Sequence, residues 1–226
     1  MPTTPLPAQN EQELLERYAA LAHDKQNDVY EVIGDNSWNV DMTDGTISFG
    51  PGLVFPMQVL GSFAHDSQTW LWAWANAQSN LPEPLLSQAR QLRAYGEQHS
   101  IDLLAVSEFD ARPNDLHAIG SIASGMFGAS GYYLANYGQG TLVVTFQSAQ
   151  VGRVVKNDYA RIATVFPQVM SVFEMRHRPA FIHYLTAKGY AVAETADAVT
   201  ATVDSGTLTA TFDDLDRLTN LQGTGR

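Results

Sequence analysis

Residues 69–75 read TWLWAWA, and Asn76 follows them. Three of the chain's four tryptophans, Trp70, Trp72 and Trp74, therefore stand at every second position. Side chains two apart in a β-strand point to the same face, so this stretch predicts a strand that carries a column of indole rings along one side. Whether that column lies inside the protein or is open to a ligand bears on both the fold and the function.

Two interpretations of the indole column remain open. In the favoured one the column packs in the core, where nearby phenylalanines such as Phe63 are available as neighbours. Small residues on the opposite face, Ala73 and Ala75, would let a helix at 82–98 lie close against that face. In the other interpretation the rings form an open aromatic groove, because exposed aromatic faces can hold sugars or bases. The ligand-binding residues of that groove would be Trp70, Trp72, Trp74 and Asn76.

Alternating apolar and polar residues predict further strands beside strong turn signals. Residues 38–42 alternate, and Asp44-Gly45 separates them from a second alternating run, which is typical of a β-hairpin. The same four-residue pattern, a turn residue followed by Gly, Thr and an aliphatic residue, occurs three times. Its glycines are Gly45, Gly140 and Gly206. We expect at least two of these three glycines to lie in hairpin turns with positive φ, because the favoured tight turns require it.

Other segments show a helical period. Apolar residues at three- and four-residue steps predict a helix from Glu11 to about Gly34. Further helices are expected at 82–98, from about Asn114, at 155–166 with its end at Pro167, and from there to Lys188. Further strands are expected at 53–63, 131–147, 190–195, 198–204 and 206–212. Because runs of strands and runs of helices are segregated, we predict an α+β fold of antiparallel sheets built from hairpins and backed by helices.

The expected domain organisation has three parts. Residues 1–9, with three prolines, are predicted to be a loose arm. Residues 10–150 would form an α+β lobe around the Trp strand, and residues 151–226 a second lobe of helices followed by three strands. Whether the two lobes share one core is left open by the sequence.

Composition bounds the class of protein. The chain has 226 residues, of which 45% are hydrophobic and 16% charged, as expected for a globular protein with a sizeable core. It has no cysteine, which excludes disulfides, zinc–thiolate sites, iron–sulfur clusters and a cysteine nucleophile. Without a long apolar run or a signal-like N-terminus, we expect a cytoplasmic protein that neither enters a membrane nor contains a cofactor or metal.

Charge suggests a binding surface. The net charge of −11 disfavours nucleic acid and favours basic partners. Residues 1–36 and 194–216 are acidic, whereas 150–190 are basic. Ordinary solvated helix faces are one explanation, and internal ion pairs with the basic segment are another. A third explanation is an acidic docking patch shared with part of 11–35 and formed by Glu194, Asp197, Asp204, Asp213, Asp214 and Asp216.

Catalytic signatures are missing from the sequence. The stretches around Ser124 and Ser130 each lack a glycine that a nucleophile elbow requires. Glu174 and His177 have the spacing of a di-metal ligand pair, but the second pair that such a site needs is absent. The polar residues that remain as candidates for an unrecognised active site are Glu108, Asp110, His117, His177 and His183.

Several stretches together resemble a known family. These are VLGSFAHDSQTWLWAWAN at 59–76 with LPEPLL just after it, HRPAFIHYLTAKGY at 177–190 and FDDLDRL at 212–218. They are similar to a widespread family of uncharacterised bacterial proteins marked by a W-x-W-A-W-A-N motif. The resemblance implies a bacterial, cytosolic α+β protein, and it implies no activity and no catalytic residues.

Three hypotheses for function follow from these observations. The preferred one is a non-catalytic protein that binds a protein partner, such as an immunity or chaperone-like protein acting on a basic toxin or effector. The second is a small-ligand-binding protein that uses the aromatic groove. The third is an enzyme with an unrecognised site.

Overall fold

The computed structural model describes residues 7–152, 159–203 and 206–225. Over this part of the chain the helices are α1 (Glu11–Ile33), η1 (Ala77–Ser79), η2 (Glu83–Leu86), α2 (Ser87–His99), α3 (Asp102–Ala105), α4 (Pro113–Met126), α5 (Tyr159–Val172) and α6 (His177–Ala187). The strands are β1 (Trp38–Asp41), β2 (Thr46–Phe49), β3 (Leu53–Ala64), β4 (Thr69–Trp72), β5 (Glu108–Asp110), β6 (Gly131–Asn136), β7 (Gly140–Phe146), β8 (Val192–Glu194), β9 (Ala198–Val203), β10 (Gly206–Phe212) and β11 (Leu218–Gly225). The fold is α+β, as the sequence predicts.

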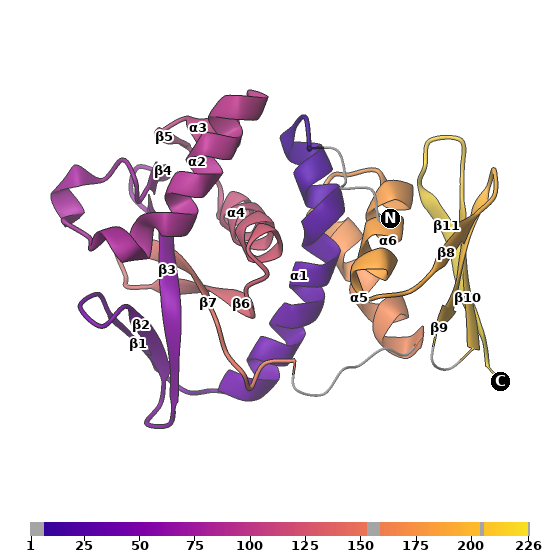
Figure 1. Cartoon of the computed structure of the whole chain (residues 1–226), viewed down its shortest axis with the longest axis horizontal. Helices are drawn as coiled ribbons and strands as arrows, with labels where there is room; N and C mark the ends of the chain where they lie inside the picture. Colours follow the sequence, from indigo (N-terminus) through magenta and orange to yellow (C-terminus); the bar gives the residue numbers. More distant parts are fainter. Residues whose placement is uncertain (1–6, 153–158, 204–205, 226) are drawn as a thin grey trace.

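The two sheets lie at opposite ends of the molecule with helices between them (Figure 1). Within the described ranges, one sheet has seven strands and the other has four in the order β11-β10-β9-β8, and all pairings are antiparallel. α1 runs through the middle, with α4 on the side of the larger sheet and α5 and α6 on the side of the smaller one (Figure 1). Buried side chains from both halves belong to one continuous hydrophobic cluster.

β3 is the central strand of the larger sheet. Its first residues pair with β2, its last residues pair with β4, and β7 lies along its other edge. The pairing with β7 skips a residue between Val59 and Gly61, so Leu60 forms a bulge. Bulges bend a strand and increase its twist. The β1–β2 hairpin therefore belongs to the same sheet as β4 and β5 while pairing with a different part of β3.

Two of the three hairpin glycines have positive φ, and of these Gly45 lies in a turn while Gly206 begins β10. Gly45 has φ of 66° and Gly206 has φ of 142°, and each stands next to an antiparallel pairing. The connection between β1 and β2 has four residues, however, because Asp41 pairs with Thr46. Gly140 has another role: a Cβ there would lie 2.6 Å from the carbonyl oxygen of Phe63, so glycine is needed for close strand contact.

Several segments differ from the sequence-based expectation. α5 continues through Pro167 to Val172, because buried residues on both sides of the proline, Phe166 and Val169, lie in one apolar stripe. That burial outweighs the cost of about 3 kcal/mol for a proline inside a helix. The smaller sheet has a fourth strand, β11, beyond the three expected. Ala8, placed by the sequence in a loose arm, is fully buried, and its N–H donates to the Tyr95 hydroxyl at 2.8 Å.

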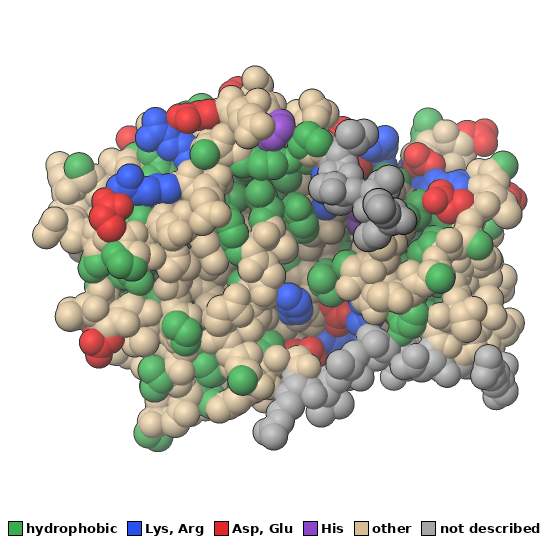
Figure 2. Space-filling model, in the orientation of Figure 1, with side chains coloured by type: hydrophobic (Ala, Val, Ile, Leu, Met, Phe, Trp, Pro, Cys, Tyr) green, Lys and Arg blue, Asp and Glu red, His purple; other side chains and the backbone are tan. Residues whose placement is uncertain are grey.

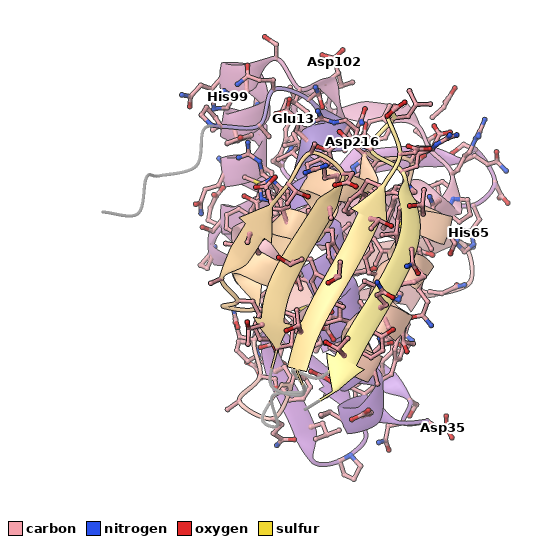
Figure 3. All side chains as sticks on the ribbon, turned by 90° about the vertical axis from the view of Figure 1, so that its right-hand side faces the viewer. Glu13, Asp35, His65, His99, Asp102 and Asp216 are labelled. Carbon is pink, nitrogen blue, oxygen red and sulfur yellow. The ribbon has the colours of Figure 1, made fainter. Side chains whose placement is uncertain are left out.

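The smaller sheet has the expected two faces. Val199, Ala201 and Leu208 point inward and are buried. Threonines of β9 and β10 alternate with them and face outward, toward the viewer in Figure 3. A threonine-rich face is what a solvated strand prefers, so this face explains the threonine content of the segment without a ligand.

Candidate functional site

The first two members of the indole column lie in the core. Trp70 and Trp72 are fully buried, and their ring centroids are 5.3 Å apart in an edge-to-face arrangement. The Trp72 indole N–H donates to the carbonyl oxygen of Leu103 in α3 at 3.1 Å. Of the two interpretations, the structure therefore selects core packing for these two rings, and neither can offer a face to a ligand.

Trp74 lies outside the strand. β4 ends at Trp72, and the chain then turns, with the Ala75 N–H donating to the carbonyl oxygen of Trp72 at 3.0 Å. The Trp74 ring is half-buried, and the guanidinium carbon of Arg93 lies 4.4 Å from the ring centroid. This cation covers one face of the ring, so ligand binding by Trp74 stays a prediction, whereas the burial of Trp70 and Trp72 leaves those two rings no open face.

The helices pack on the indole side of the Trp strand, whereas the sequence predicts a helix on the side of Ala73 and Ala75. Leu103 of α3 contacts Trp72 and Arg93 of α2 covers Trp74, so α2 and α3 lie on the indole side. Gly61, which pairs with Trp72, makes this arrangement possible. A Cβ at Gly61 would lie 2.4 Å from the Trp70 ring. The ring can therefore occupy this position only because Gly61 has no side chain.

Ala73, the residue just after β4, borders an apolar pocket, which we call the hairpin pocket. Its volume is about 350 Å³, and it lies between the β1–β2 hairpin, β3, the segment after β4, and the β6–β7 turn. Its lining is mainly apolar. The residues that line it are Trp38, Val40, Met42, Val59, Gly61, Ser62, Ala73, Asn76, Ser79, Leu81, Tyr137 and Leu142.

Asn76 is the only residue of the predicted ligand-binding set found in the described lining of this pocket. Its side-chain oxygen accepts a hydrogen bond from the Ser79 N–H at 3.2 Å, and the Ser79 hydroxyl donates to the Asn76 carbonyl oxygen at 2.7 Å. These two bonds fix the short turn that carries Asn76. The fourth tryptophan of the chain, Trp38, also lines the pocket, although its place outside the TWLWAWA stretch gave no signal for it.

The predicted acidic patch is partly neutralised within the chain. Asp213 accepts hydrogen bonds from Arg217, and its carboxylate lies 2.6 Å from the Arg217 guanidinium. Glu194 lies 4.0 Å from Arg178. Among the residues that the structure covers, Asp197, Asp214 and Asp216 have no ion pair, whereas Asp204 lies outside the described residues. The five described acids are therefore only partly paired within the chain.

The acids in and just after α1 lie near both ends of the helix and between them. Glu13 lies at the same end of the molecule as Asp216, and Asp35 lies at the opposite end (Figure 3). One face of the surface shows acidic and basic side chains interspersed in small groups (Figure 2). In the middle of the helix, Glu16 and Asp24 are buried and face the C-terminal helices.

Ion pairs connect these buried carboxylates to α5, α6 and the segments around them. Asp24 contacts Arg161 and accepts hydrogen bonds from the Lys188 ammonium at 2.5 Å and the Tyr184 hydroxyl at 2.8 Å. Glu16 accepts two bonds from the Arg176 guanidinium, at 2.9 and 2.8 Å. Burial alone would raise the pKa of the Asp24 carboxyl, but the bonds from Lys188 and Arg161 outweigh it and hold that pKa below its ordinary value.

A second cluster of acids, which we call the acidic cleft, is brought together by the fold. Glu11, Asp102, Asp110 and Asp115 come from α1, α3, β5 and α4, and they surround a cleft of about 300 Å³. The remaining lining is apolar and consists of Leu103, Val106 and Phe109. Burial, and then the negative charge of Asp115, raise the pKa of Glu11. Sequence patterns could not reveal this cluster, because Glu11 is far from the other three acids in the chain and those three lie on separate elements.

The candidate catalytic residues are not assembled into a site. Glu108 and Asp110 lie on β5, at one end of the larger sheet, and His177 begins α6, where its Nδ1 accepts the Leu218 N–H at 3.1 Å. Within the described ranges, no hydrogen bond or ion pair joins any two of the five candidates. The remaining candidates, His117 and His183, lie on α4 and α6.

His117 is part of a buried hydrogen bond. Its Nδ1 lies 3.0 Å from the Tyr132 hydroxyl. Burial, with a smaller contribution from the positive charge of His23, lowers the pKa of His117. Burial also raises the pKa of Tyr132 to about 12. Both shifts favour the neutral forms, so the half-buried His117 and the buried Tyr132 form a neutral hydrogen bond between α4 and β6.

Metal clusters and membrane spans are both absent from the described residues. In that part of the chain, no group of three or more His, Asp or Glu side chains is placed to hold a metal ion. No helix there combines the length and the apolar character that a membrane span requires.

Comparison with known proteins gives one match. Residues 12–149 match the model of a family of unknown function (DUF6882), so the chain belongs to this family. The matched segment begins in α1 and ends just after β7, and it includes all the lining residues of the hairpin pocket and those of the acidic cleft other than Glu11. No curated protein and no solved structure matches the chain.

Proposed function

We propose that this protein binds a small, uncharged and mainly apolar ligand in the hairpin pocket. The observation that carries the proposal is a pocket of about 350 Å³ whose lining includes the large apolar side chains Trp38, Met42 and Leu142. Ligand pockets commonly have volumes of about 300–1,000 Å³ and a mainly apolar lining with a few polar groups. The hairpin pocket fits that description in both size and chemistry.

The polar groups define the class of ligand further. Ser62, Asn76, Ser79 and Tyr137 supply hydroxyls and an amide, and among the described lining residues there is no charged side chain. Asn76 uses its side-chain oxygen in the turn, which leaves its two amide N–H groups as donors. A ligand with an aromatic or aliphatic body and one carbonyl or hydroxyl group would satisfy both parts of the lining.

The tryptophans provide a direct assay. Trp70 and Trp72 are buried and Trp74 is covered by Arg93, whereas Trp38 lines the pocket. Binding of an apolar fluorescent probe such as N-phenyl-1-naphthylamine should quench Trp38 and should saturate. In Trp38→Phe the protein should still bind the probe by calorimetry, while the tryptophan signal should no longer respond.

A charge placed in the pocket provides the matched control. Val40→Glu adds a carboxylate to the lining, so we expect affinity for the probe to fall at least tenfold, since burying an unpaired charge is costly. Val54→Glu adds the same charge at a side chain that is 58% exposed and outside the pocket, and its affinity should be unchanged. Equal binding by Val40→Glu and wild type would show that the probe binds elsewhere and would refute the proposal.

A second candidate function is binding of a basic protein partner, in the manner of an immunity or chaperone-like protein. The acidic cleft favours it, because four carboxylates surround an apolar floor that includes Val106, which is 42% exposed. A lysine or arginine side chain has an apolar stem and a cationic head, so its two parts match the floor and the rim. This proposal places the protein and its partner in the bacterial cytoplasm, the location expected from the sequence.

The partner proposal is tested by a salt-dependent pull-down from the native host. The double variant Asp102→Asn with Asp110→Asn should lose a partner that wild type captures at low salt. The control is Asp35→Asn with Asp66→Asn, which removes the same charge at exposed positions outside the cleft. A partner that is retained at high salt, or that is lost equally by both variants, would contradict docking at the acidic cleft.

A further inference from the structure

A second hollow in the larger sheet has a lining of a different chemistry. It has a volume of about 590 Å³ and lies between the start of α2, the first half of β3, the end of β7 and the end of α4. We call it the glutamine pocket. Its lining consists of Pro56, Met57, Gln58, Pro84, Ser87, Gln88, Gln91, Phe127, Thr145, Phe146 and Gln147.

Three of the four glutamines, Gln58, Gln88 and Gln147, are held by hydrogen bonds to other segments. The Gln58 amide donates to the Pro84 carbonyl oxygen at 2.8 Å and accepts from the Gln88 N–H at 3.2 Å. The fully buried Thr145 hydroxyl donates to the side-chain oxygen of Gln88 at 2.5 Å. Long side chains lose rotamer freedom when they bind a ligand, so amides already fixed by neighbours bind at a lower entropic cost.

Specific hydrogen-bonding groups remain for a ligand. Gln88 has its oxygen occupied by Thr145, and in the described part of the chain its amide N–H groups make no hydrogen bond. Gln91 donates its amide to Ser87, which leaves its side-chain oxygen as an acceptor. These residues are one turn apart on α2, so a donor and an acceptor stand beside each other at the start of the helix.

The absence of charge and the single accessible ring narrow the class of ligand. No charged side chain belongs to the described lining, although both signs occur nearby in the sequence. Phe146 is buried, and Phe127 is half-buried, so one aromatic ring is available for contact. A flat nucleobase is commonly held by stacking on rings, whereas a sugar can place an apolar C–H face on one ring and its hydroxyls on amides.

We propose that the glutamine pocket is a binding site for a neutral mono- or disaccharide. Vicinal sugar hydroxyls each donate and accept, and an adjacent amide donor and amide acceptor match such a pair. Gln88 and Gln91 hold the hydroxyls, Thr145 positions Gln88, and the Phe127 ring contacts the C–H face. This site is separate from the hairpin pocket, with which it shares no lining residue.

The test is calorimetric titration with glucose, galactose, N-acetylglucosamine and maltose, and with adenosine as a comparison. At least one sugar should bind saturably. Gln88→Met preserves the length of the side chain and removes both amide groups, so the dissociation constant should rise at least tenfold. Gln91→Met, at an exposed position, is the second variant should Gln88→Met fail to fold, and it should weaken binding in the same direction.

Gln98→Met is the matched control, because Gln98 lies on the same helix, is exposed and does not line the pocket. Its affinity should equal that of wild type. The proposal is overturned if none of the sugars binds, if adenosine binds and the sugars do not, or if Gln91→Met and Gln98→Met bind as tightly as wild type. Probe binding at the hairpin pocket should be unchanged in Gln91→Met, which separates the two proposals.

Discussion

Asp24 connects the two halves of the molecule, and replacing it with asparagine tests that role. Its carboxylate is 7% exposed and contacts Arg161, Tyr184 and Lys188. Asp24→Asn keeps the shape of the side chain but removes the negative charge beside two largely buried cations. Arg161 retains its ion pair with Asp28 at 2.9 Å.

The expected magnitude follows from this burial. Removing one partner of a buried ion pair costs about 3–5 kcal/mol. Because Arg161 keeps one carboxylate, we expect about 3 kcal/mol for Asp24→Asn at neutral pH, a large part of the roughly 5–15 kcal/mol that stabilises an ordinary domain. The measurement is urea unfolding followed by circular dichroism. Asp35→Asn, at an exposed position just beyond the same helix, should change the free energy of unfolding by less than about 0.5 kcal/mol.

The pH dependence gives an independent check on the same residue. The folded-state pKa of Asp24 lies below its ordinary value of 3.8. The stabilisation by the ionised carboxylate is therefore fully present above the unfolded-state pKa and is lost as the pH falls through the folded-state pKa. The difference between wild type and Asp24→Asn should shrink below about pH 4. A difference under about 1 kcal/mol at pH 7, or one that does not change with acidification, would refute the role assigned to Asp24.

Two further predictions concern the Trp strand. Trp72→Ala should lower the free energy of unfolding by about 3–5 kcal/mol, since it removes a fully buried indole. Trp74→Ala should lower it by less in the same urea titration. The reverse order would contradict the assignment of Trp72 to the core. Gly61→Ala should cost about 1–3 kcal/mol, because its Cβ would lie 2.4 Å from the Trp70 ring and 2.5 Å from the Leu71 carbonyl oxygen. Gly52→Ala, where no atom lies within 4 Å of the added Cβ, is its control, and equal effects of the two substitutions would argue against a packing role for Gly61.

The features predictable from the sequence are those that local patterns determine. The first helix has a continuous apolar period, an N-cap in Asn10 and a C-cap in Gly34, so its bounds follow closely from its residues. The β1–β2 hairpin follows from alternation around a turn signal. β11 was missed because it is largely polar, with exposed residues such as Thr219 and Gln222, and its position comes from pairing with β10.

The binding sites could not be predicted, because they depend on contacts between distant segments. The indoles face the helices because Gly61 leaves space for a ring on that side of β3. The alternation of residues in the Trp strand does not show which side the helices cover. The hairpin pocket depends on such contacts too, since Ala73 and Asn76, just after β4, line it together with Trp38 and Val40 of β1. Trp38 became a site residue through that hairpin, more than thirty residues before Asn76.

Ion pairs within the chain explain part of the uneven charge distribution of the sequence. The acidic first helix and the basic segment at 150–190 meet in the ion pairs of Glu16 with Arg176 and of Asp24 with Arg161 and Lys188. Charges that are paired and buried this way contribute little field outside the protein, whereas clustered unpaired charges raise the local potential. The second proposed function therefore predicts that the carboxylates of the acidic cleft attract the basic partner. Neutralising Asp213 or Glu194, whose charges arginines already offset, should change such an association less than neutralising Asp102 or Asp110.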